Sequence, residues 1–368
     1  MIDKIDNLSL EQRVGQLFCI GIAGPEIDDA TRELLDEVQP GGICLFARNI
    51  KSASQTRELL DSLRDVLPIM PILSVDQEGG TVDRLRRLVT PMAPAGKVRT
   101  LEQAARMGEI IAEMLRILGF NMDFAPVVDV VDEERAAYSN GLFTRPFGRS
   151  KEQVVELAGA FLTSLQEGGI LGCIKHFPGL GAAVVDSHEE LPRIEIDESQ
   201  FNETDLFPYT ETAPENIHSV MVAHACYPNI ALQERDRDGK LLPSSLSNNI
   251  VNGLLRGHFG YKGVAFTDDL EMGAILRNYG IGEACKMAVN AGEDVLAICA
   301  DPQNVRCGLN AVLAAVRDGE IEVARLNESL ARIATLKAKL SEPLPFDEAR
   351  ITSISDEIAA FNAELENN

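Results

Sequence analysis

Eight short apolar runs, separated by longer segments with helical periodicity, are the feature that most constrains how this chain can fold. The runs cover residues 17–22, 42–46, 72–75, 122–128, 173–175, 219–223, 263–267 and 295–299. Their near-continuous apolar character is typical of parallel strands that are covered on both faces. Alternation of strands with helices predicts an α/β fold. Eight such units favour a single (β/α)8 TIM-type barrel, and an open doubly wound sheet is the alternative.

The segments between the runs carry apolar residues three and four positions apart, as helices on the outside of a barrel require. We expect helices at residues 52–66, 101–118, 151–166, 247–257, 282–291 and 304–317. The proline-containing run SEPLP at 341–345 interrupts this pattern, and a last helix is expected over 353–365. These features predict a barrel domain, 1–340, and a C-terminal helical extension, 341–368, packed on the barrel.

The formal net charge of −23 argues against nucleic acid or an anionic membrane surface as a partner, because both would repel the chain. A small anionic substrate remains possible, since a local site can be cationic. No apolar stretch approaches the roughly 18 residues that a membrane helix needs. The first apolar run is also too short and too late in the chain for a signal peptide.

The seven cysteines form no C-x-x-C pair, and Cys19, Cys44, Cys173 and Cys299 lie within apolar runs. We expect buried thiols in a reducing compartment. The sequence therefore predicts a cytoplasmic protein, and we expect it to be a monomer.

Polar residues stand just beyond seven of the eight runs. They are Arg48 and Asn49, 76–78, Asp129, Lys175 and His176, His224, Asp268 and Asp269, and Asp301. Any one of them could simply cap a helix. In a parallel barrel, however, the carboxyl ends of the strands converge on one face, where active sites lie. The seven positions together predict a catalytic site at that face.

The densest polar segment is KHFPGLG at 175–181, followed at once by DSH at 186–188. Asp186 and His188 are two residues apart, so their side chains can meet in a turning loop. A carboxylate that binds one imidazole nitrogen raises the basicity of the other and yields an acid/base near neutral pH. A solvated polar loop is the alternative for such a pair, but Lys175 and His176 close by favour chemistry.

Three further positions could serve a polar ligand. Asp268 ends a strand and is rigidly aimed, as a covalent nucleophile must be, whereas Asp269 is expected to be structural. Asp76 precedes two glycines that let the chain turn away from the barrel mouth, so Asp76 could accept sugar hydroxyls. Arg145, in a long excursion at 131–148, could supply a fork of donors or serve only as an ion-pair partner.

His176, His188 and His224 are candidate metal ligands, together with the neighbouring aspartates. Their spacing contains no H-x-H or H-E-x-x-H pair, and the glycine pairs at 41–42 and 79–80 lack the Lys-Ser/Thr of a phosphate loop. We therefore expect neither a metal nor a cofactor.

These segments together resemble glycoside hydrolase family 3. The motifs that carry the resemblance are RVGQLF at 13–18, GGICLFARN at 41–49, DQEGG at 76–80, FAPVVDV at 124–130, RPFG at 145–148, the stretch 175–188, MVAH at 221–224, PSSLS at 243–247, TDDL at 267–270 and AGED at 291–294. The DSH run at 186–188 is similar to that of the family's single-domain β-N-acetylglucosaminidases. Two-domain β-glucosidases of the family instead take their acid/base from a second domain.

The resemblance implies a retaining exo-glycosidase that releases terminal β-linked N-acetylglucosamine. Asp268 would form the glycosyl-enzyme intermediate, and His188, oriented by Asp186, would act as acid and then as base. The residues implied to hold the sugar hydroxyls are Asp76, Arg145, Lys175 and His176. A neutral imidazole repels an anionic leaving group less than a second carboxylate would, which fits a substrate bearing lactyl-muramic acid and hence a role in peptidoglycan recycling.

The chain departs from the family pattern at three places. Leu180 stands where a histidine is usual, Thr81 stands where an arginine is usual, and residues 138–144 lack the usual Asn-Pro-x-Ile-Gly run. The alternatives are therefore a β-glycosidase or glycoside phosphorylase with another sugar preference, a non-catalytic sugar-binding relative, and a metal-dependent barrel hydrolase.

Overall fold

The fold is a closed barrel of eight parallel strands, seen in a computed structural model that describes residues 8–138, 142–187, 189–212 and 216–367. The strands are hydrogen-bonded in the order β1-β10-β9-β8-β7-β6-β3-β2. Their bounds are β1 Phe18–Ile20, β2 Gly42–Leu45, β3 Ile72–Val75, β6 Met122–Asp123, β7 Leu171–Phe177, β8 Ser219–Val222, β9 Val264–Asp269 and β10 Val295–Ile298. Each strand overlaps one of the eight apolar runs, so the predicted (β/α)8 barrel is confirmed.

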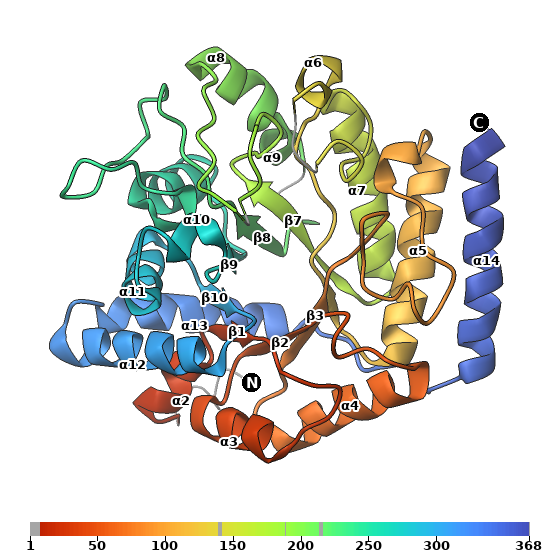
Figure 1. The fold of residues 1–368 in the computed structure, drawn as a ribbon, viewed down its shortest axis with the longest axis horizontal. Coiled ribbons are helices and arrows are strands. Elements are labelled where there is room, and N and C mark those ends of the chain that lie inside the picture. Colours follow the sequence, from red (N-terminus) through yellow and green to blue (C-terminus); the bar gives the residue numbers. More distant parts are fainter. Residues whose placement is uncertain (1–7, 139–141, 188, 213–215, 368) are drawn as a thin grey trace.

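Helices surround the barrel (Figure 1). Those of ten residues or more are α3 Asp29–Val38, α4 Ala53–Val66, α5 Leu101–Leu118, α7 Lys151–Glu167, the π-helix η5 Asn249–His258, α11 Ile281–Ala291, α12 Pro302–Asp318, α13 Val323–Lys337 and α14 Glu348–Asn367. The shorter ones are α2 Leu10–Gly15, η1 Ala95–Lys97, α6 Glu133–Ala136, α8 Glu198–Gln200, the π-helix η2 Phe201–Asp205, α9 Phe207–Glu211, η4 Ser244–Leu246 and α10 Gly273–Leu276. The expected helices are confirmed in position, although residues 249–258 adopt π-helical rather than α-helical hydrogen bonding.

Local sequence explains where the long helices begin and end. At the start of α5 the Thr100 side chain accepts from the Gln103 backbone N–H. The Gln103 side chain in turn accepts from the Thr100 backbone N–H, which completes a capping box. Gly119, with a φ of 103°, ends that helix. Gly108 allows close approach to α7, because a Cβ there would lie 2.6 Å from the Phe161 carbonyl oxygen. The helical layer is thus packed tightly outside β6.

The sequence patterns did not reveal the two-stranded hairpin of β4 Gln77–Gly79 and β5 Val82–Asp83. Its strands are too short to show an alternating pattern. Gly79 and Gly80 have φ values of 84° and 61°, so the turn uses a backbone region that favours glycine. The hairpin folds back over the mouth of the barrel immediately after β3.

Helix α14 stands alongside α5 on the outside of the molecule (Figure 1). Arg350 of α14 makes an ion pair with Glu113 of α5, at 2.6 Å. Asn362 accepts from the Ala93 backbone N–H and donates to the Pro91 carbonyl. The side of α14 that faces α5 is apolar, with Ile354, Ile358 and Phe361 buried.

Among the described residues, none of the helices combines the length and the apolar character that crossing a membrane would require.

A network of buried charges closes the amino-terminal end of the barrel. Asp294, just before β10, accepts from Arg256, Arg325, Arg332 and Ser329. Its neighbour Glu293 is fully buried, and neither carboxyl oxygen has a hydrogen-bond partner among the described residues. Burial raises the pKa of Glu293 well above its ordinary value. Burial therefore favours the uncharged form of this carboxyl group in the folded protein.

Replacing Glu293 with glutamine should stabilise the protein at neutral pH. Because the pKa of Glu293 is raised in the folded chain, the unfolded chain releases this proton at a lower pH than the folded chain does, so wild-type stability falls as pH rises above about 4.5. Thermal unfolding at pH 7.5 should give a higher Tm for Glu293→Gln than for wild type, and the difference should shrink towards pH 5. Glu33→Gln, on the exposed face of α3, is the control and should change the Tm at neither pH. A lower Tm for Glu293→Gln at pH 7.5 would contradict this account.

Candidate active site

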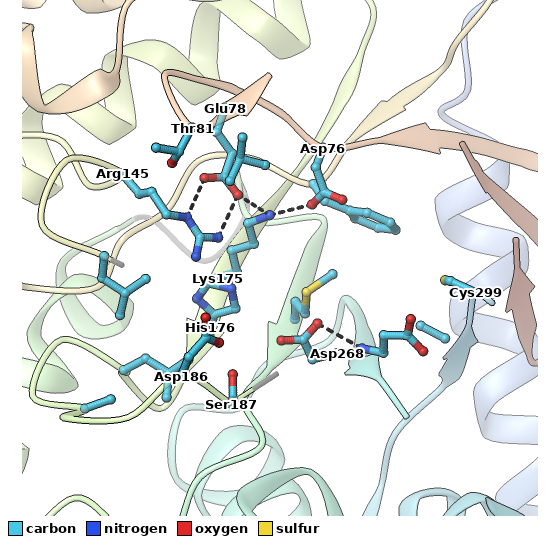
Figure 2. Close-up of a pocket in the computed structure, with 18 of the residues that line it drawn as sticks. Asp76, Glu78, Thr81, Arg145, Lys175, His176, Asp186, Ser187, Asp268 and Cys299 are labelled. Carbon is cyan, nitrogen blue, oxygen red and sulfur yellow. Dashed lines mark hydrogen bonds and ion pairs between the residues drawn. The ribbon is translucent and has the colours of Figure 1, made fainter. Parts of the chain in front are cut away.

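A cavity of about 300 Å³ opens at the carboxyl ends of the strands. That is within the range of sites that hold small ligands. It is lined by six of the seven predicted site residues: Asp76, Arg145, Lys175, His176, Asp186 and Asp268. Figure 2 shows these side chains arranged around one space, although they come from distant parts of the chain. The seventh, His188, lies outside the described residues.

The inner wall of this cavity is a cluster of two cations and two carboxylates. The Lys175 Nζ lies 2.7 Å from Asp76 Oδ1 and 2.6 Å from Glu78 Oε1. Arg145 donates two hydrogen bonds of 2.8 Å to the two oxygens of Glu78. Figure 2 shows the four side chains joined in a row by these contacts. Arg145 is therefore an ion-pair partner, and it also lines the cavity.

The charges in this cluster fix one another. Burial alone would raise the pKa of Glu78, but the Arg145 and Lys175 charges outweigh it and hold that pKa well below its usual range. Burial alone would lower the pKa of Lys175, but the Asp76 and Glu78 carboxylates raise it above its ordinary value. The pKa of Arg145 is raised in the same way, with Glu78 the main opposing charge to burial. Lys175 and Arg145 therefore present donors with a constant charge to any ligand at physiological pH.

Glu78 is a site residue that the sequence reasoning missed. The signal was present in DQEGG, because residues two apart in an extended segment point to the same side. Asp76 and Glu78 accordingly reach the same ammonium group from the end of β3 and from β4. The longer Glu78 side chain is the one that ties Lys175 to Arg145.

His176 is oriented by Asp129. Its Nδ1 lies 2.7 Å from Asp129 Oδ2, and its backbone N–H donates to Asp129 Oδ1 at 3.3 Å. The peptide bond between Lys175 and His176 is cis, and the pairing register with β8 shifts between Lys175 and Phe177. Both consecutive side chains line the cavity there. Asp129 was noted from the sequence only as a polar residue beyond a strand.

Asp268 enters the cavity from β9, and its surroundings hold it in place. Its Oδ1 accepts from the Asp269 backbone N–H at 2.8 Å. The Asp269 carboxylate accepts from the Glu271 N–H at 3.0 Å and so holds the turn after the strand, and Asp269 also lines the cavity. Burial raises the pKa of Asp269 to about 7. The two neighbouring carboxyl groups thus have different environments.

His224, at the end of β8, supports the same turn. The Asp269 carbonyl oxygen can only accept, so His224 Nε2 donates to it at 3.1 Å and Nδ1 accepts from the Ser245 hydroxyl at 2.7 Å. Burial lowers the pKa of His224, which agrees with a neutral ring. His224 is therefore a positioning residue beneath Asp268 and Asp269.

Asp186 and Ser187 line the cavity from the loop that follows β7. In Figure 2 they lie beyond His176, across the space from the Glu78–Arg145 pair. The Ser187 carbonyl accepts from the Ala274 N–H at 3.2 Å, which joins this loop to α10 after β9. The loop is therefore in direct contact with the helix that follows the strand carrying Asp268.

The departures from the family pattern also fall on this cavity. Leu180 is buried and lines the wall, together with Leu142 and Ala183. Thr81, at the turn of the hairpin, is exposed and lines the rim. Within the part of the chain that the structure describes, no three His, Cys, Asp or Glu side chains are grouped so that they could hold a metal ion.

A closed barrel with a polar, charge-paired cavity at its carboxyl-terminal face is the architecture of a barrel enzyme that acts on a polar ligand. The chain belongs to glycoside hydrolase family 3, because the model of the "Glycosyl hydrolase family 3 N terminal domain" matches residues 9–336. It is therefore a glycoside hydrolase.

Individual relatives agree with this assignment. The chain is 33% identical to a protein named beta-hexosaminidase from Tolumonas auensis, over 80% of this chain and 84% of that protein. It is 32% identical to another so named from Nitrosomonas eutropha, over 77% of this chain and 81% of that protein. A solved family 3 beta-N-acetylglucosaminidase from Paenibacillus sp. FPU-7 superimposes with a TM-score of 0.85 at 33% identity, covering 96% of this chain and 69% of that one.

Glu78→Gln should damage ligand binding through Lys175 and Arg145. Both cations would lose a charged partner in a buried site, which costs about 3 kcal/mol of stability and frees both side chains to move. We expect kcat/KM on an aryl glycoside to fall about a hundredfold, because misplaced binding groups weaken transition-state contacts. Steady-state kinetics and thermal unfolding measure the two effects.

The control for Glu78→Gln is Glu113→Gln, which breaks the half-exposed ion pair with Arg350 between α5 and α14. It should leave kcat/KM unchanged and alter Tm only slightly. Unchanged kinetics in Glu78→Gln would show that the cluster is not needed to hold the ligand.

Proposed function

We propose that this protein is a retaining exo-β-N-acetylglucosaminidase that hydrolyses terminal β-linked N-acetylglucosamine. The observation that carries the proposal is the cavity itself: Asp268 enters it from β9, and Asp76, Lys175 and Arg145 line it as charged groups. The choice of N-acetylglucosamine as the sugar is supported by the names of the relatives from Tolumonas auensis and Paenibacillus sp.. A volume of about 300 Å³ suits one terminal sugar with its leaving group directed outwards.

In this mechanism Asp268 attacks the anomeric carbon and displaces the leaving oxygen, so that a covalent glycosyl-Asp268 ester forms. Water then attacks the same carbon, and the ester bond to Asp268 breaks. Two inversions give net retention of configuration. Hydroxyl groups of the sugar accept from Lys175 and Arg145 and donate to Asp76, which holds the anomeric carbon in front of the nucleophile.

The acid/base in the proposal is His188, oriented by Asp186. The imidazolium gives its proton to the departing oxygen in the first step, and the neutral ring takes a proton from water in the second. Support comes from Asp186, which lines the cavity, and from the contact between this loop and the segment after β9. A histidine in this role departs from the carboxylate pair of most glycosidases.

Asp268→Asn should abolish turnover of nitrophenyl N-acetyl-β-glucosaminide, with a fall in kcat of more than about a thousandfold. Asp269→Asn is the matched neighbour, and its kcat should fall far less.

In His188→Ala, kcat should fall about a hundredfold with a poor leaving group and less with dinitrophenolate, which needs little protonation. NMR of the first product should show the β-anomer. Full activity of Asp268→Asn, or an α-anomer as first product, would refute the mechanism.

We further propose that the natural substrates are peptidoglycan fragments and that hydrolysis takes place in the cytoplasm. A histidine in place of a second carboxylate puts no negative charge beside the leaving sugar, which lowers repulsion of its anionic lactyl group. All seven cysteines are free, and six of them are buried, which suits a reducing compartment.

The peptidoglycan assignment predicts a preference between two disaccharides of equal length. kcat/KM should be higher for N-acetylglucosaminyl-N-acetylmuramic acid, whose lactyl carboxylate is free, than for chitobiose. The same muramic substrate with its lactyl carboxylate blocked as a methyl ester serves as the control that separates charge from shape. Equal efficiency on the muramic substrate and chitobiose would remove the support for this source, while leaving the glycosidase assignment intact.

A further inference from the structure

The stem of the loop that carries Asp186 is held by contacts on several sides. The Gly179 carbonyl accepts from the Tyr227 hydroxyl at 2.5 Å, and the Leu180 N–H donates to Asp129 Oδ1 at 2.6 Å. Gly181 lies so close to the preceding βα loop that a Cβ would be 2.0 Å from the Val130 carbonyl oxygen. Gly179, at a φ of 136°, lies directly against Asp205, since an added Cβ would be 2.8 Å from the Asp205 Cβ.

Arg135 joins two of these contact points. It donates to both oxygens of Asp205, at 2.8 and 2.7 Å, and to the Val130 carbonyl, at 3.0 Å. Arg135 belongs to α6, on the excursion after β6 that also carries Arg145, whereas Asp205 ends the π-helix η2. The Arg135 guanidinium therefore binds both Asp205, which lies against Gly179, and Val130, which lies against Gly181.

This ion pair lies apart from the ligand cavity. Neither Arg135 nor Asp205 lines the cavity, and their side chains are 6% and 0% exposed. Taking both charges out of water costs much of what their attraction returns, and apolar residues of similar size often give equal stability. Burial raises the pKa of Asp205 to about 6 in spite of Arg135. A contribution to stability alone does not account for such a pair, whereas its fixed two-point geometry suits a positioning role.

We propose that Arg135 and Asp205 are positioning residues that fix the stem at 179–181 and thereby set how Asp186 and the acid/base on the same loop reach the leaving-group oxygen. The inference rests on the proposed function, because it assumes that this loop delivers the proton. Loosening the stem should impair proton delivery more than nucleophilic attack by Asp268, which is carried by a different strand.

The test compares the leaving-group dependence of kcat/KM across aryl N-acetyl-β-glucosaminides, from dinitrophenyl to phenyl. Arg135→Met keeps an unbranched apolar stem and removes the guanidinium fork. Its kcat/KM should fall at least about tenfold more with phenyl than with dinitrophenyl, because only the poor leaving group needs the proton. The double variant Arg135→Met/Asp205→Leu should recover stability but keep the steeper dependence.

The matched control is Arg256→Met, which breaks another buried ion pair, with Asp294 at the amino-terminal end of the barrel, where the side chains are 10% and 0% exposed. It should lower Tm and leave the leaving-group dependence as in wild type. If Arg135→Met does not fold, Arg135→Lys, which keeps the charge but not the fork, is measured in the same series.

The positioning role would be overturned if Arg135→Met showed the same leaving-group dependence as Arg256→Met. Where Arg135→Lys replaces Arg135→Met, the same comparison applies to it. Wild-type dependence in the double variant would also overturn the positioning role. These outcomes are separate from failure of the proposed function, which would show itself as unchanged turnover in Asp268→Asn or His188→Ala.

Discussion

The buried ammonium group of Lys175, held between two carboxylates, is the interaction on which the cavity depends. Without Asp76 and Glu78, burial would lower the pKa of Lys175, and without the lysine the two carboxylates would repel each other. The same arrangement brings Arg145 in from a loop more than sixty residues away in sequence from Glu78. Charge pairing thus assembles residues from β3, β4, β7 and the excursion after β6 into one wall.

Two loops are then fixed relative to this wall by buried polar contacts rather than by regular secondary structure. The excursion after β6 is anchored through Arg145 at the cavity and through Arg135 behind it. The loop after β7 is anchored through Asp129 and Tyr227. The rigid barrel therefore places the proposed nucleophile, while a separate set of side-chain bonds places the proposed acid/base loop.

The barrel could be predicted from the sequence because each of its strands and helices has a recognisable pattern within a short segment of the chain. Each strand is a short apolar run and each main helix a periodic one, so counting units was enough. The hairpin β4–β5 could not be predicted, because its strands are two and three residues long. Membership of Asp76, Lys175 and Asp268 in one cavity followed from strand ends alone. Glu78 and Asp129 also follow strands, but their pairing with Arg145 and His176 could not be predicted from that, nor could the pairing of Asp205 with Arg135, since long-range pairing leaves no periodic signal.

The paired charges of the inner wall have a consequence for how ligands arrive. Lys175, Arg145 and Arg84 are paired with Asp76 and Glu78 at this wall, so no negative charge is left unpaired among them, while the chain as a whole carries −23. An uncharged saccharide would then be captured at a rate that hardly changes with ionic strength. An anionic one would approach against long-range repulsion that salt screens, so its encounter rate would increase as the Debye length shortens.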